Sequence, residues 1–204
     1  MLIWVNGPFG VGKTAVAHEL ARRLDVERTG RAVVCDPEHV GFGLHRMMPP
    51  ALRGDFQDLP AWRSGVVEVL DLVLREQTGP VVVPMTVLDP AYLDELVGGL
   101  RRRGHRVAHV SLLAQRETVV RRLRGRGLPG LRREGFALAQ LDRALDVLAT
   151  RPFATQVRTD GLGVSAVADE VARVGRLGMR PDTDGPARAW LRRTAVSLRH
   201  VRLD

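Results

Sequence analysis

Residues 7–14 read GPFGVGKT and match the phosphate-binding loop pattern G-x-x-x-x-G-K-[ST] at every fixed position. The apolar run LIWV at residues 2–5 precedes this loop and has the length of a buried strand. The segment AVAHELARRL at residues 15–24 follows the loop and carries apolar residues at helical spacing. Strand, loop and helix thus occur in the order that a phosphate site requires, which favours such a site over a chance glycine turn.

The residue types in the loop suit a nucleoside triphosphate. Glycines allow backbone angles and close approaches that a Cβ would block, so successive N–H groups can face phosphate oxygens. A helix that starts at the end of the loop adds the positive end of its dipole. Lys13, the only lysine among 31 basic residues, would reach the β- and γ-phosphates, and the Thr14 hydroxyl would ligate Mg²⁺. The predicted ATP-binding residues are Gly7, Pro8, Phe9, Gly10, Val11, Gly12, Lys13 and Thr14.

The composition is typical of one domain with an appendage. A chain of 204 residues that is 45% hydrophobic can bury one substantial core, and its single cysteine excludes an intramolecular disulfide framework. No stretch approaches the ~18 apolar residues of a membrane span, and the N-terminus lacks the pattern of a signal peptide, so we expect a cytoplasmic protein. A net charge of +8 would suit a polyanion, but the arginines are dispersed and aromatic residues make up only 4%. We therefore expect a nucleotide and a small-molecule substrate, and no nucleic-acid partner.

Four further strand candidates alternate with helical segments along the chain. They occupy residues 31–35, 80–86, 106–112 and 155–160. The apolar run at residues 80–86 is nearly continuous, which predicts a central strand that ends near Pro84. The alternation predicts an α/β fold in which a mainly parallel five-stranded sheet lies between two layers of helices. We expect this domain to cover residues 1–180, with a linker and a further helix over residues 181–204.

Asp36 follows the second predicted strand and is a candidate for chemistry. Ligands of open parallel sheets bind at the carboxyl ends of the strands, so the Asp36 carboxylate would face the same crevice as the phosphate loop. There it would act as a general base toward a substrate hydroxyl, or bind water on the metal. The alternative is a structural one, in which Asp36 caps a helix or shapes the turn before Pro37.

Two basic segments frame the second half of the chain. Residues 116–135 pass from a basic helix into a Gly/Pro-rich stretch and predict a lid, in which Arg122 and Arg126 would donate to the transferred phosphoryl group. The alternative is a solvated basic helix face. Residues 187–203 predict a basic amphipathic helix, which either docks on the core or lies on an anionic membrane at its inner face.

Several stretches together resemble the tunicamycin-resistance protein family over most of the chain, to about residue 180. They are LIWVNGPFGVGKT (residues 2–14), DPEHVGFGL (36–44), DFQDLPAWR (55–63), VPMT (83–86) and ETVVRRLRGR (117–126). The resemblance implies a P-loop kinase-like fold, binding of ATP, and antibiotic resistance through tunicamycin, a lipidated nucleoside that mimics a UDP-sugar. It also implies a membrane attachment through the C-terminal helix. The Gly/Pro-rich residues 127–135 depart from the family pattern.

The leading hypothesis is an ATP- and Mg²⁺-dependent phosphotransferase that modifies a hydroxyl of tunicamycin or of a UDP-sugar-like compound. Lys13, Asp36, Arg122 and Arg126 would be its catalytic residues. Its substrate side would be formed by Asp55, Gln57, Trp62, Arg63 and Thr86. The competing hypothesis is a non-catalytic ATP-dependent binder that sequesters the drug at the membrane. A GTPase with an Asn-Lys-x-Asp motif is excluded, because the chain has one asparagine and one lysine.

Overall fold

The computed structural model describes residues 1–24, 26–124, 140–149 and 155–184. In chain order the elements are β1 (Leu2–Asn6), α1 (Lys13–Arg23), α2 (Val26–Thr29), β2 (Val33–Val34), α3 (Glu38–Met47), η1 (Pro50–Leu52), η2 (Phe56–Asp58), α4 (Pro60–Glu76), β3 (Val81–Pro84), α5 (Pro90–Leu93), η3 (Asp94–Gly98), α6 (Gly99–Arg102), β4 (Val107–Leu113), α7 (Arg116–Arg124), α9 (Leu141–Leu148), β5 (Thr155–Arg158) and α10 (Val164–Gly175). The stretch α5–η3–α6 is one helical run with a π-helical middle.

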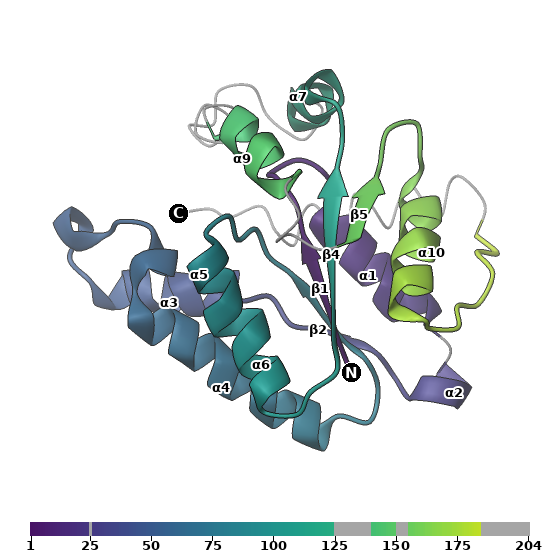
Figure 1. The fold of residues 1–204 in the computed structure, drawn as a ribbon, viewed down its shortest axis with the longest axis horizontal. Helices are drawn as coiled ribbons and strands as arrows, with labels where there is room; N and C mark the ends of the chain where they lie inside the picture. Colours follow the sequence, from purple (N-terminus) through teal and green to yellow (C-terminus); the bar gives the residue numbers. More distant parts are fainter. Residues whose placement is uncertain (25, 125–139, 150–154, 185–204) are drawn as a thin grey trace.

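The five strands form one sheet in the order β2-β3-β1-β4-β5, and every neighbouring pair is parallel. Helices α1 and α10 cover one face, and α4 with α5 and α6 covers the other (Figure 1). Helices α7 and α9 lie near the carboxyl end of the sheet (Figure 1). The predicted α/β fold with a parallel five-stranded sheet is confirmed.

Strand β1 lies in the middle of this sheet, and all five of its residues are buried. Its side chains alternate between two cores. Ile3 and Val5 pack with α1 and α10, whereas Leu2 and Trp4 pack with α4 and the α5–α6 run. Because both faces of β1 are apolar and covered, its carboxyl end is fixed at the centre of the domain.

Two strands differ from the expectation. Strand β2 pairs only over Val33 and Val34, which are partly buried, because β2 lies at the edge of the sheet. Strand β3 ends at Pro84, as predicted, and is fully buried, but the central position belongs to β1. An apolar run marks a strand that is covered on both faces and does not say which interior position that strand takes.

The second half of the domain is described in part. Helix α7 forms the start of the predicted lid, whereas Arg126 and the predicted helix at residues 187–203 lie outside the described residues. None of the described helices combines the length and the apolarity needed to cross a bilayer.

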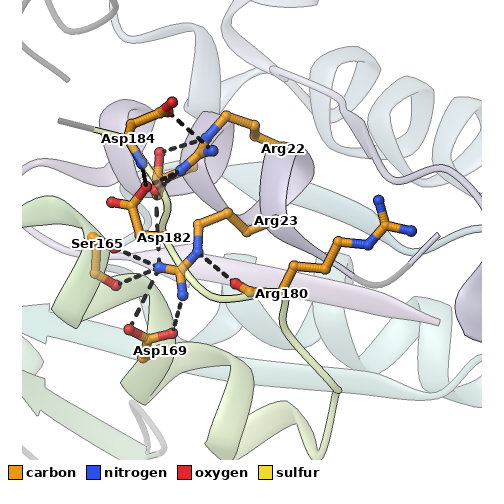
Figure 2. A network of polar contacts seen from close by, with 8 residues as sticks. Arg22, Arg23, Ser165, Asp169, Arg180, Asp182 and Asp184 are labelled. Atoms are coloured by element: carbon orange, nitrogen blue, oxygen red, sulfur yellow. Dashed lines mark hydrogen bonds and ion pairs between the residues drawn. The ribbon is translucent and has the colours of Figure 1, made fainter. Parts of the chain in front are cut away.

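A network of arginines and carboxylates connects the C-terminal end of α1 to α10 and to the segment after α10 (Figure 2). Arg23 is 4% exposed; its Nη2 forms an ion pair with Asp169 Oδ1 at 2.6 Å, and its Nε donates to the Arg180 carbonyl at 2.9 Å. Arg22 forms ion pairs with Asp182 at 2.8 Å and with Asp184 at 3.2 Å. Residues 181–184, which the sequence assigned to a linker, therefore lie against α1.

We predict that Arg23→Met lowers the free energy of unfolding by about 2 kcal/mol, because hydrogen bonds to charged groups contribute roughly 1.5–3 kcal/mol and the half-exposed Asp169 can rehydrate. The matched control is Arg173→Met on α10. Arg173 pairs with Glu170, but the two side chains are 73% and 44% exposed, so its loss should cost less than about 1 kcal/mol. Urea unfolding measures both variants, and equal losses would contradict a special role for the Arg23 network.

Candidate nucleotide-binding site

The loop between β1 and α1 places a positive helix end at the carboxyl edge of the middle strand. Gly12 is the N-cap of α1 with φ 112°, and no side chain caps the helix. The first turn of α1 contains no acidic residue. The N–H groups and the dipole of this helix end are therefore not compensated from within α1, which suits an anion.

The positions of Gly10 and Gly12 in the loop require glycine for reasons that differ in part. A Cβ on Gly12 would meet nothing within 4 Å, so Gly12 is required for its left-handed backbone. Gly10 also has a left-handed backbone, with φ 84°, and a Cβ on it would in addition lie 2.6 Å from Leu123 Cγ on α7. The motif predicts that a glycine here allows the close approach of phosphate, and at Gly10 the missing side chain also allows α7 to pack against the loop.

Lys13 folds back over the loop. Its Nζ donates to the carbonyl of Gly7 at 2.9 Å and to that of Pro8 at 3.1 Å. The side chain is 8% exposed, and its Nζ lies 5.3 Å from the ring centroid of Phe9. The ammonium is thus held among loop carbonyls at the start of α1. Thr14 follows in the first turn and is partly buried.

The first residue of the loop is held by side chains on both sides. Asn6 Oδ1 accepts from Gly7 N at 2.8 Å and from Val87 N at 3.0 Å, and Asn6 Nδ2 donates to the Val87 carbonyl at 2.8 Å. Thr86 Oγ1 donates to the Gly7 carbonyl at 2.8 Å. Both side chains are buried, so the segment after β3 fixes where the loop begins.

The sequence pattern does not single out Asn6, and Thr86 is expected on the substrate side. The available signal for Asn6 was its position as a polar residue at the end of an otherwise apolar strand, directly before the loop. For Thr86, the structure instead shows a buried hydroxyl that is bound to the loop backbone.

His109 lies behind Asn6 on β4. Its Nε2 is 3.5 Å from Asn6 Nδ2, and its side chain is buried. Burial lowers the pKa of His109 to about 4, with a further contribution from the positive charge of Arg101. The imidazole is therefore neutral at pH 7, and its Nε2 can face the Asn6 amide as an acceptor.

Asp36 lies at the carboxyl edge of the sheet, as expected, but one strand further from the loop than its sequence position implied. Strand β3 separates β2 from β1, which puts about 10 Å between the axes of β2 and β1. Asp36 Oδ1 accepts from the backbone N–H of Glu38 at 2.9 Å, at the start of α3. The side chain therefore takes the turn-shaping role that sequence reasoning gave as its alternative.

The guanidinium of Arg122, which is expected to donate to the transferred phosphoryl group, is bound to protein oxygens instead. Its Nη1 donates to the Val11 carbonyl at 3.0 Å and to Thr159 Oγ1 at 2.8 Å, while its Nη2 donates to the Thr159 carbonyl at 2.8 Å. Burial lowers the pKa of Arg122, although a guanidinium stays charged at pH 7. The residue fastens the phosphate loop to the segment after β5.

Of the residues expected on the substrate side, Asp55 and Arg63 both contact Gln57, whereas Trp62 lies in the core and Thr86 at the phosphate loop. Trp62 is 0% exposed and donates from Nε1 to the Pro37 carbonyl at 3.0 Å, so its expected place on the substrate side is corrected to the core. Arg63 is also buried: it pairs with Glu95 at 2.6 Å and donates to the Gln57 carbonyl at 2.5 Å. Asp55 is exposed and accepts from Gln57 N at 2.9 Å. Asp55 and Gln57 thus shape the turn before α4.

Comparisons with known proteins agree with this fold. A family model described as an AAA domain matches residues 2–151. The structure is similar to that of a tunicamycin resistance protein from Deinococcus radiodurans, with 36% sequence identity, a TM-score of 0.72, and coverage of 88% of this chain and 98% of that chain.

Two kinases have the same fold at lower identity. A gluconokinase from Sinorhizobium meliloti is 19% identical, with a TM-score of 0.59 and coverage of 85% of this chain and 91% of that chain. An APS kinase from Mycobacterium tuberculosis is 20% identical, with a TM-score of 0.58 and coverage of 86% and 96%. Among curated protein sequences, none matches the chain significantly.

We predict that the buried His109 makes the protein sensitive to mild acid. Between pH 6.5 and pH 4 the unfolded chain binds a proton on this imidazole that the folded chain does not bind, so stability falls as the pH falls. The loss should approach about 3 kcal/mol at pH 4, since one pKa unit corresponds to ~1.4 kcal/mol.

His109→Gln should remove this part of the pH dependence, whereas His39→Gln, a change at an exposed histidine, should keep it. The measurement is urea unfolding at pH 7, 5.5 and 4, compared between the variants and the unaltered protein. Parallel pH profiles for His109→Gln and the unaltered protein would show that His109 is not responsible.

Proposed function

The chain belongs to the tunicamycin-resistance protein family and carries a kinase-like AAA domain, and from that premise we propose that it is an ATP-dependent phosphotransferase. Its substrate is a small molecule with a free hydroxyl, tunicamycin or a related nucleotide-sugar-like compound. The observation that carries the proposal is the Lys13 ammonium, held 2.9 Å from the Gly7 carbonyl at the start of a helix that no side chain caps.

The described residues fit ATP. The backbone of residues 7–12 with the uncapped start of α1 would hold the phosphates, and Gly12 leaves open space where a Cβ would stand. Lys13 would exchange its carbonyl partners for the β- and γ-phosphates. Mg²⁺, when bound, would neutralise the negative charge that develops on the transferred phosphoryl group.

The donor set for this magnesium is small. Among the described residues, no group of three or more His, Cys, Asp or Glu side chains could hold a metal ion. Mg²⁺ keeps several waters and commonly needs only one or two protein oxygens beside the substrate phosphates. The Thr14 hydroxyl fits this role, and Asp36 could bind a metal water without being a direct ligand.

Asp36 is the proposed general base. The oxygen of the substrate hydroxyl forms a bond to the γ-phosphorus of ATP, the bond to the bridging oxygen of ADP breaks, and the hydroxyl proton moves to the Asp36 carboxylate. A carboxylate has about four lone-pair sites, so the bond from Glu38 N to Oδ1 does not by itself prevent Asp36 from accepting a proton. Strand β3 lies between β2 and β1, so a substrate would have to extend about 10 Å along the carboxyl edge of the sheet, over the end of β3, to contact both Asp36 and the loop.

Of the two arginines expected to donate to the transferred phosphoryl group, we propose a different role for one. Arg122 already binds two backbone carbonyls and a hydroxyl, so we propose that it holds the loop. Arg126, which lies outside the described residues, remains the proposed donor to the transferred group.

A second candidate is a non-catalytic binder that sequesters tunicamycin and uses the helix expected at residues 187–203 to stay at the membrane. The observation that favours it is the contact of Asp36 with Glu38 N, because a carboxylate that only shapes the start of α3 requires no chemistry. This binder needs the phosphate loop but no general base.

We predict that Lys13→Ala weakens ATP binding by at least about 10- to 100-fold, because charged hydrogen bonds to the terminal phosphates are lost. AMP binding should change little, since AMP lacks the phosphates that Lys13 reaches. Calorimetric titration measures both ligands. ATP affinity that is unchanged in a folded variant would mean that the loop does not serve ATP.

We predict that Asp36→Asn preserves ATP and drug binding but lowers phosphoryl transfer by about 10²- to 10⁴-fold. The matched control is Asp89→Asn, because Asp89 also precedes a proline and accepts from a backbone N–H two residues on, at 2.7 Å. The assay is mass analysis of tunicamycin and UDP-sugars after incubation with Mg-ATP.

The possible outcomes distinguish three roles of Asp36. A phosphorylated product that is lost in Asp36→Asn and kept in Asp89→Asn supports the base. The absence of product with the unaltered protein, together with tight drug binding, supports the sequestering function. Loss of Mg-ATP binding in Asp36→Asn alone would place Asp36 in the metal shell.

A further inference from the structure

The carbonyl of Gly7 accepts two side-chain donors at once. Lys13 Nζ approaches it at 2.9 Å and Thr86 Oγ1 at 2.8 Å. A carbonyl oxygen has two lone pairs, so both bonds can be made together. The residue that is expected to bind phosphate and a buried threonine from the segment after β3 therefore share one acceptor.

Sharing this acceptor has an energetic consequence for phosphate binding. Gly7 is buried, and a buried carbonyl that loses its only partner costs about 1–3 kcal/mol. If Lys13 were the only donor, a phosphate that attracts the ammonium would leave the Gly7 carbonyl unpaired. The Thr86 hydroxyl removes that cost, because it stays on the carbonyl when Lys13 leaves.

Thr86 is held firmly enough for this role. It is 4% exposed and follows β3, which is paired on both sides in the sheet. The next residue, Val87, is bound through both its N–H and its carbonyl to the Asn6 side chain. The hydroxyl is therefore placed by backbone that is itself fixed to the start of the loop.

A hydroxyl at this position differs in kind from a carboxylate. A carboxylate at the end of β3 would form an ion pair with Lys13 and retain it, whereas a neutral hydroxyl donates to the carbonyl and offers the ammonium no opposite charge. The sequence VPMT at residues 83–86 supplies no acid there.

We propose that Thr86 is a positioning residue that keeps the Gly7 carbonyl satisfied and so releases Lys13 to the terminal phosphates of a bound nucleotide. The inference rests on the proposed function in assuming that the loop binds ATP. It assigns Thr86 no contact with the substrate.

Two variants test the proposal. Thr86→Val keeps the shape of the side chain and removes the donor, and Thr86→Ser restores it. We expect Thr86→Val to weaken Mg-ATP binding by about 3- to 10-fold, with AMP binding unchanged, because only the terminal phosphates require Lys13. Thr86→Ser should bind ATP as the unaltered protein does. Calorimetric titration gives each affinity.

A second measurement does not require nucleotide. Because Lys13 is the only lysine, its reaction with an amine-selective reagent is followed by fragmenting the N-terminal peptide, which separates the label on Lys13 from a label on the Met1 α-amino group. In Thr86→Val, Lys13 is the remaining donor to the Gly7 carbonyl, so its reaction should be several-fold slower than in the unaltered protein. Thr118→Val, at another buried threonine, should leave the rate unchanged.

The outcomes separate this inference from the proposed function. If the unaltered protein does not bind ATP but Thr86→Val still slows the labelling of Lys13, the proposed function fails and the shared acceptor stands. If Thr86→Val leaves both ATP affinity and labelling unchanged, or weakens AMP and ATP binding equally, Thr86 is only structural. If Thr86→Val does not fold, Thr86→Cys takes its place, since a thiol is a weak donor.

Discussion

The backbone of Gly7 is the fixed point of this domain. Asn6 holds its N–H group and Thr86 holds its carbonyl, both through buried side chains. Because Gly7 directly follows the middle strand, these bonds set the point at which the chain leaves the sheet and the direction in which α1 begins. The positive end of α1, the Lys13 ammonium and the Thr14 hydroxyl are all placed relative to this one residue.

The arginine content has a structural explanation. Arg23 and Arg122 are each bound to backbone carbonyls and to side-chain oxygens, and Arg63 is bound to Glu95 and to a carbonyl. A guanidinium offers five donors in a rigid plane, so one arginine can satisfy several acceptors from separate segments. Part of the net charge of +8 therefore serves to connect helices and loops. A lysine, with a compact ammonium, occurs only in the phosphate loop.

The difference between an enzyme and a sequestering protein depends on Asp36. Its carboxylate lies at the edge where substrates of this fold meet the nucleotide, and it also accepts from the first turn of α3. A role in shaping the turn and a role as a base are compatible, because a carboxylate has more lone pairs than the bond to Glu38 N uses. Strand β3, with Thr86 after it, lies between Asp36 and the loop. The structure thus separates the proposed base from the proposed phosphate site by about two strand spacings, roughly 10 Å.

The sequence by itself determined the phosphate loop, the five strands and their parallel arrangement, because these depend on local patterns: a fixed motif, apolar runs and the alternation of strands with helices. It did not determine the order of the strands, since a run that is covered on both faces reads the same at any interior position. It also could not show that Trp62 is core and that Arg122 holds Val11, because an aromatic or charged residue is assigned to a site or to the interior only by what other segments place around it. The bond of Thr86 to Gly7 joins residues 79 positions apart, the bonds of Asn6 to Val87 join residues 81 positions apart, and only the tertiary structure brings them together.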